Sequence, residues 1–189
     1  MEFKQIRAVY DKNTIRVYQA YCPAIASEAV KLGKFGSNFS LNRMTWIKPS
    51  FLWMMYRCGW AQKSGQERVL AIDIDRNAFD YMINNAVVSS YKPELGITRE
   101  DWKELIQTSE VRVQWDPERD IYGNPLEYRS IQIGIRGLSV YRYVNEWTRK
   151  ITDITDFVKE LDSMKNDGID ITAKLPKEEI YIPSKPENY

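Results

Sequence analysis

The sequence contains no histidine, and this absence removes several classes of chemistry at once. Ser-His and Cys-His nucleophile pairs, histidine metal ligands and imidazole acid–base catalysis all need a side chain that the chain lacks. Any general base must therefore be an Asp, Glu, Lys or Tyr side chain, or a bound water. Only two cysteines are present, which excludes a structural zinc site and predicts free thiols in a reducing cytosol.

Long apolar runs are also missing. No stretch approaches the roughly 18 apolar residues of a membrane helix. Residues 1–13 are charged and lack the apolar centre of a signal peptide. Nothing in the sequence suggests a carboxylate-held magnesium, so no metal is expected. We therefore expect a soluble, cytoplasmic protein that does not interact with membranes.

The residues that are present predict one globular domain. A chain of 189 residues with 43% hydrophobic side chains can bury a substantial core. Its charge is uneven, because residues 1–70 hold 11 of the 27 Lys and Arg residues but only 4 of the 26 Asp and Glu residues. This asymmetry suggests a basic face that attracts phosphate, although the two halves could instead simply neutralise one another.

Periodicity and capping residues predict an α+β fold, in which a mixed or mainly antiparallel sheet is flanked by helices. We expect one domain over residues 1–168 and a loosely held, extended tail over 169–189, where proline and charge are frequent. The predicted strands cover residues 14–21, 43–48, 67–74, 111–116 and 130–135. The predicted helices cover residues 23–32, 50–59, 75–88, 98–107, 140–151 and 155–164.

The densest functional signal is the segment 43–60, RMTWIKPSFLWMMYRCGW. Its helical part places Phe51, Met54, Met55 and Cys58 on one face, which is typical of core packing. Four residues on the short segment before the helix are not explained by packing: Arg43, Thr45, Trp46 and Lys48. Cations, a hydroxyl and an indole beside free helix N–H groups predict a receptor for a phosphate-bearing aromatic ligand, and Arg57 and Lys63 could extend it.

A second signal is the segment 114–120, QWDPERD, in which a strand runs into a turn. One of its carboxylates could accept a ribose hydroxyl proton or stabilise developing positive charge. The alternative is a salt-bridged turn in which Asp116 caps backbone N–H groups.

A third signal is the strand at 129–134, where Ser130, Gln132 and Gly134 share the face opposite the isoleucines. A strand glycine often marks the close approach of a ligand or of another backbone. If this strand pairs with the preceding one, Gln114, Asp116 and Gln132 line one surface, and a slip of one residue would separate them.

The first strand adds Tyr18 and Gln19, whose polar atoms need partners because one face or the other must be buried. They could contact a ligand, or Tyr18 could make a purely structural hydroxyl bond. The predicted ligand-binding residues are therefore Tyr18, Gln19, Arg43, Thr45, Trp46, Lys48, Gln114 and Gln132.

Four motifs together resemble a bacterial and fungal family, the domain of unknown function numbered 4291. They cover the chain in order and are VYQAY at 17–21, RMTWIKPSFLWMMYRCGW at 43–60, QWDPERD at 114–120 and RSIQIGI at 129–135. This resemblance implies no activity.

A shorter segment, RMTWI at 43–47 with the helix that ends in Gly59, is similar to the opening of DNA-modifying ADP-ribosyltransferases. In those enzymes an Arg/Thr/His strand element meets NAD, whereas here Trp46 stands where the histidine would be. The resemblance implies an ADP-ribosyltransferase-like fold, NAD as cofactor, and NAD contacts from Arg43 and Thr45. It also implies a late catalytic glutamate, for which Glu118 is the candidate, with Asp116 or Asp120 as substitutes.

Three functions remain open at this point. The leading hypothesis is an NAD-dependent transferase of the ADP-ribosyltransferase type that acts on a nucleotide or nucleic acid, with Glu118 and Asp116 as its catalytic residues. The second is a non-catalytic binder of RNA or single-stranded nucleic acid that stacks bases on tryptophans. The third is a hydrolase or transferase of phosphorylated nucleotides that relies on carboxylates and lysine. All three require the motifs at 43–48 and 114–120 to meet around one hollow.

Overall fold

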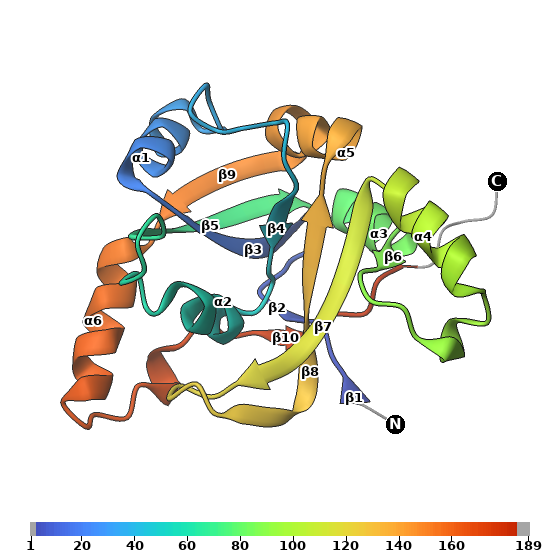
Figure 1. Cartoon of the computed structure of the whole chain (residues 1–189). Helices are drawn as coiled ribbons and strands as arrows, with labels where there is room; N and C mark the ends of the chain where they lie inside the picture. Colours follow the sequence, from blue (N-terminus) through green and yellow to red (C-terminus); the bar gives the residue numbers. More distant parts are fainter. Residues whose placement is uncertain (1–2, 185–189) are drawn as a thin grey trace.

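Two β-sheets form the centre of the molecule in the computed structural model, which describes residues 3–184 (Figure 1). In this view the strands β3, β5 and β9 lie to the left of the long strands β7 and β8 and run across the direction of β8. The first sheet consists of β1 (Phe3–Lys4), β4 (Thr45–Ile47), β6 (Val87–Val88), β7 (Val111–Arg119) and β8 (Pro125–Ile135). The second consists of β3 (Thr14–Tyr21), β5 (Arg68–Asp75) and β9 (Thr148–Asp153), and a two-stranded ribbon joins β2 (Arg7–Ala8) to β10 (Glu179–Ile180).

Helices cover the outside of these sheets, so the predicted α+β single-domain class is confirmed. They are α1 (Pro23–Leu32), α2 (Phe51–Cys58), α3 (Arg76–Asn84), α4 (Arg99–Thr108), α5 (Gly137–Arg142) and α6 (Thr155–Asn166). None of the helices within residues 3–184 has the length and apolar character that a membrane crossing requires.

Local sequence explains where several helices begin and end. Pro23 occupies the first turn of α1, and Gly33 ends this helix with a φ of 69°, a left-handed conformation that glycine adopts without strain. The Asp75 side chain accepts backbone N–H bonds at the start of α3. Thr98 and Asp101 form the expected capping box of α4.

Two predicted helices were too long. The helix expected over 75–88 ends at Asn84, and Val87–Val88 instead pairs with β7 in parallel. The helix expected over 140–151 stops at a π-helical turn, Tyr143–Trp147, after which β9 pairs with β5. Ile151 fits a helical pattern in sequence, but it lies opposite Ile72 in the sheet, so tertiary pairing overrides the local preference.

The strand pair β7 and β8 is antiparallel, as predicted, and longer than expected. β7 continues to Arg119 and β8 begins at Pro125, so the turn predicted over 117–125 is confined to residues 120–124. Asp120 organises that turn by accepting the backbone N–H groups of Tyr122 and Asn124.

The C-terminal segment is not loosely held within the described residues. β10 pairs antiparallel with β2, and the backbone N–H of Tyr181 donates to the Ile6 carbonyl at 2.7 Å. The Tyr181 ring is 2% exposed and packs edge-on against Phe79. One buried aromatic therefore anchors a segment whose average composition predicted a tail. Residues 185–189 lie outside the described part of the chain.

The apolar residues form two clusters on opposite sides of the second sheet. The larger cluster fills the space between the sheets, with Val17 and Ile72 facing Ile131 and Ile133. The smaller cluster lies against α2 and α6 and includes Tyr18. β3 is thus buried on both faces.

One segment connects the two sheets. Thr45–Ile47 pairs with Ile133–Ile135 of β8, and the next residue, Lys48, bridges to Tyr18 of β3. The Tyr18 N–H donates to the Lys48 carbonyl at 2.7 Å, and the Lys48 N–H donates back at 3.3 Å. The backbone of Lys48 is therefore fixed where the sheets meet.

Candidate functional site

Two adjoining hollows open beside this junction. The first, called here the β3–β4 hollow, has a volume of about 370 Å³ and lies between β3, β4 and the residues after α2. The second, the β7–α2 hollow, has a volume of about 470 Å³ and lies between α2 and the strands β7 and β8. Trp46, Lys48 and Arg57 line both, so they form the boundary that the two hollows share.

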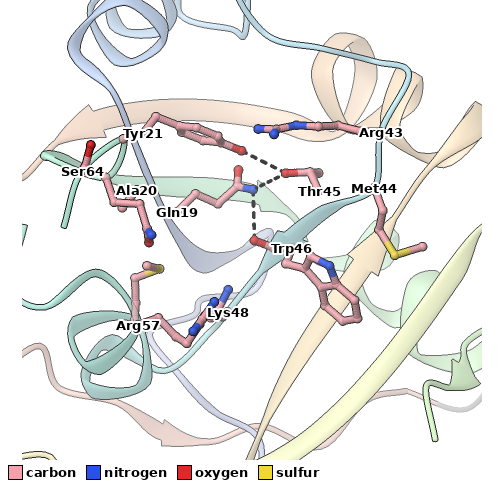
Figure 2. Close-up of a pocket in the computed structure, with 13 residues that line it drawn as sticks. Gln19, Ala20, Tyr21, Arg43, Met44, Thr45, Trp46, Lys48, Arg57 and Ser64 are labelled. Atoms are coloured by element: carbon pink, nitrogen blue, oxygen red, sulfur yellow. Dashed lines mark hydrogen bonds between the residues drawn. The ribbon is translucent and has the colours of Figure 1, made fainter.

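A buried hydrogen-bonded network forms one wall of the β3–β4 hollow (Figure 2). The Gln19 amide donates to the Thr45 hydroxyl at 2.7 Å and to the Trp46 carbonyl at 3.1 Å. The Tyr143 hydroxyl donates to the Gln19 carbonyl oxygen at 2.8 Å, and the Tyr21 and Thr45 hydroxyls share a bond of 2.9 Å. Gln19 and Thr45 thus line the hollow as predicted, but their polar atoms already have partners.

The side chain of Lys48, unlike those of Gln19 and Thr45, makes no such bonds within residues 3–184. Its side chain is 6% exposed, and within residues 3–184 its ammonium has no hydrogen bond or ion pair. The pKa of Lys48 is lowered to about 8, chiefly by burial and also by the charge of neighbouring Arg57, while the carboxylate of Asp116 opposes both. Figure 2 shows the side chains of Lys48 and Arg57 on the same side of the hollow. The Lys48 side chain is buried, but its amine is not among the fully buried polar atoms without a partner and so reaches the surface of the hollows, where a ligand can contact it.

The acidic part of the site lies in the β7–α2 hollow. Gln114 and Gln132 are directly opposite each other in the strand register, which is the pairing that the predicted convergence required. Asp116 accepts from the Gln114 amide at 2.9 Å through Oδ1 and from the Gln132 amide at 2.8 Å through Oδ2. Two amides therefore hold this carboxylate in place beside the hollow that Lys48 also lines.

The β7–α2 hollow has an aromatic and cationic wall in which Tyr56 and Arg119 were not singled out from the sequence. Trp53 and Tyr56 of α2 stack with ring centroids 5.4 Å apart, and the Arg119 guanidinium lies 4.2 Å from the Tyr56 ring centroid. Strict alternation along β7 would place Arg119 on the face opposite Gln114 and Asp116. A register irregularity between Pro117 and Arg119 accounts for its presence in the same hollow.

Glu118 does not join the other predicted site residues. It is buried and lines a separate hollow, between the start of α2 and the C-terminal segment, together with Arg7, Tyr128 and Glu178. Burial raises the pKa of Glu118. Of the two predicted catalytic carboxylates, the structure brings only Asp116 to Lys48 and Trp46.

The start of α2 is also not free to bind a phosphate, contrary to the expectation from sequence. The Ser50 hydroxyl accepts the Trp53 N–H at 3.1 Å, and a Glu178 carboxylate oxygen accepts the Phe51 N–H at 2.6 Å. Glu178 comes from the C-terminal segment, 127 residues further along the chain. No local pattern reveals that this distant carboxylate occupies the helix N-terminus.

The remaining predicted residues divide between the hollows and the core. Arg43 is exposed at the rim of the β3–β4 hollow. Tyr18 lies in the apolar cluster under α2, edge-on to Phe51, and its buried hydroxyl has no hydrogen-bond partner within residues 3–184. Lys63 donates to two carbonyls at the end of α2, so it closes this helix and does not extend the site.

Gly134 allows the Trp46 indole to lie across β8. The two residues are paired in the sheet, and a Cβ atom on Gly134 would lie 3.0 Å from the Trp46 ring and 2.7 Å from the Met44 sulfur. The glycine was expected to mark the close approach of a ligand or backbone. It instead makes room for two side chains that line the β3–β4 hollow.

The fold and this site define a single-domain α+β protein with a cationic, indole-bearing hollow beside a carboxylate. A family model described as Domain of unknown function (DUF4291) matches residues 5–181, so the chain belongs to this family. The motif-based resemblance to this family is thereby confirmed. No curated protein matches the chain.

Proposed function

We propose that the two adjoining hollows bind a nucleotide, and that the protein is an NAD-dependent transferase of the ADP-ribosyltransferase type. The observation that supports this proposal is the meeting of two distant segments. Trp46 and Lys48 of the first lie around the same hollow as Gln114 and Asp116 of the second.

Each side chain has a role that its chemistry suits. Lys48, Arg57 and Arg43 supply cations for a pyrophosphate, since the phosphate charge offsets the repulsion between buried and neighbouring cations. The Trp46 indole offers a face on which a base or a nicotinamide ring stacks.

Asp116 is the proposed catalytic residue. Breaking the ribose–nicotinamide bond sends the bonding electron pair to the nicotinamide nitrogen and leaves positive charge on the ribose. A carboxylate held by Gln114 and Gln132 would stabilise that charge without reorganising. An acceptor oxygen or nitrogen then forms the new bond to the ribose carbon and releases its proton.

The experiment compares Asp116→Asn with Glu118→Gln, because sequence alone favoured Glu118. With NAD, the wild-type protein should show a raised melting temperature and release nicotinamide, measured by calorimetry and chromatography. We expect Asp116→Asn to lower nicotinamide release by about 100-fold or more, and Glu118→Gln to leave the rate unchanged. The proposal is wrong if saturating NAD changes neither the melting temperature of the wild-type protein nor the product.

A further inference from the structure

We propose that Lys48 is a nucleophilic amine that forms an imine with a phosphorylated aldehyde or ketone bound in the hollows. This goes beyond the proposed NAD chemistry, which needs Lys48 only as a cation. The inference depends on three structural features: the burial of the amine, its lack of partners and the charges around it.

The first feature is the position of the amine. Lys48 is buried where the two sheets meet, and its backbone is held by both bonds to Tyr18. Its side chain nevertheless lines both hollows, so a small ligand entering from either side reaches it. A fixed backbone and an enclosed site restrict the approach of a carbonyl group to the amine nitrogen.

The second feature is that no hydrogen bond or ion pair within residues 3–184 holds the charged form of Lys48. The Asp116 carboxylate acts on the amine by its charge, and both of its oxygens accept bonds from glutamine amides. Arg57 repels a proton on the amine, and burial acts in the same direction. The neutral amine, which has a free electron pair, is therefore more populated at a given pH than in an exposed lysine, as in lysines that form Schiff bases.

The third feature is the ring of cations that would recognise the ligand. Arg57 lines both hollows, Arg43 is at the rim of one and Arg119 is in the other. Arginines present forked donors that suit a phosphate, and they stay charged at the pH values where Lys48 loses its proton. The arginines would bind the phosphate and Lys48 would attack the carbonyl carbon, so the site would select a carbonyl compound that carries phosphate.

Imine formation needs no cofactor. The nitrogen electron pair attacks the carbonyl carbon, and a carbon–nitrogen bond forms as the carbonyl oxygen takes up a proton. The nitrogen gives up its protons, and the former carbonyl oxygen leaves as water, which completes the imine. Asp116, beside the same hollow, is placed to accept and return a proton during the loss of water.

The test uses pyridoxal 5′-phosphate as a phosphorylated aldehyde probe, with pyridoxal as the matched probe that lacks phosphate. Each is added at low stoichiometry, reduced with borohydride and mapped by peptide mass spectrometry. We expect Lys48 to be labelled at least 10-fold faster than the exposed Lys159, the rate to rise with pH up to about 8, and inorganic phosphate to slow it. Pyridoxal should show a smaller preference for Lys48, because it reacts with the neutral amine but has no phosphate for the arginines to bind.

Mapping on the wild-type protein makes the result independent of how a variant folds, and Lys48→Arg serves as a second check that should lose only the Lys48 adduct. Labelling of Lys48 no faster than Lys159, or equal labelling by both probes, would overturn the inference. Such a result combined with an NAD-induced rise in melting temperature leaves the proposed function intact. Fast Lys48 labelling without any NAD effect supports the imine site and removes the NAD proposal.

Discussion

The buried polar side chains at the junction of β3 and β4 differ in whether their polar atoms have hydrogen-bond partners. Gln19, Thr45 and Tyr143 satisfy one another in a closed network. Lys48, three residues after Thr45, is buried as deeply and has no partner within residues 3–184. The first arrangement stabilises the junction between the sheets, whereas the second costs stability. This contrast supports the proposal that the Gln19 network is structural and that Lys48 binds a ligand.

Breaking the satisfied network should have the largest effect. Gln19→Leu leaves the Tyr143 hydroxyl and one Thr45 bond without partners in the core, and we expect a loss of about 2–4 kcal/mol in the free energy of unfolding. Gln107→Leu on the exposed face of α4 is the control and should change stability by less than about 0.5 kcal/mol. Chemical denaturation measures both, and equal effects would contradict a structural role for the network.

Removing the Lys48 amine should raise the free energy of unfolding. Lys48→Met replaces a buried charge with a flexible apolar chain, so we expect a gain of about 1–3 kcal/mol at pH 7 and a loss of nucleotide binding. The folded pKa of about 8 lies below the unfolded value near 10.5, so the wild-type protein gains stability as pH rises between these values. The variant should lack this gain. A less stable Lys48→Met protein with a normal ligand affinity would contradict the interpretation.

Gly134→Ala tests the surface on which Trp46 rests. The added methyl group would meet the Trp46 ring and the Met44 sulfur, and overpacking of this kind costs about 1–2 kcal/mol. We expect a shift in tryptophan fluorescence and weaker nucleotide binding. Partial recovery of binding in Gly134→Ala combined with Met44→Ala would show that crowding is the cause. An unchanged affinity in the single variant would mean that the ligand does not use this indole.

The carboxylate at the start of α2 should give the smallest change in acid and a larger change as pH rises. The pKa of Glu178 is raised to about 8, chiefly by burial and also by the charge of Glu118, while the Phe51 N–H bond opposes both. Because the folded pKa is above the unfolded value near 4.5, this group makes the protein less stable as pH rises from about 4.5 to 8. Glu178→Gln keeps an acceptor for Phe51, so it should match the wild-type protein at about pH 4, and its advantage in stability should grow to more than about 1 kcal/mol at pH 9. Thermal unfolding across this range measures the difference, and identical pH profiles would contradict it.

Much of the fold could be predicted because it depends on local chemistry. Pro23 and Gly33 bound α1, and the capping box of α4 was readable from Thr98 and Asp101. The alternation of isoleucines in β8 set the face on which Gln132 lies, and the register then placed it opposite Gln114. This part of the site was accessible because strand pairing follows period two.

Other features could not be predicted because their causes are distant in the chain. β9 is a strand because β5 lies beside it, although its residues fit a helical pattern. Glu178 occupies the N-terminus of α2 from 127 residues away. Glu118, two residues from Asp116, opens into a different hollow, and a register irregularity brings Arg119 into the hollow with Asp116.

The amino-acid sequence alone determined the class of fold, the absence of histidine chemistry and the residue types of a cationic, aromatic segment and an acidic strand. These follow from composition, periodicity and capping, which act over a few residues. Only the tertiary structure decided that Lys48 and Asp116 share a hollow while Glu118 does not, and that the buried Lys48 side chain has no hydrogen-bond partner among residues 3–184. Burial and charge proximity depend on which segments pack together, and they set the chemistry of a side chain more strongly than its neighbours in sequence do.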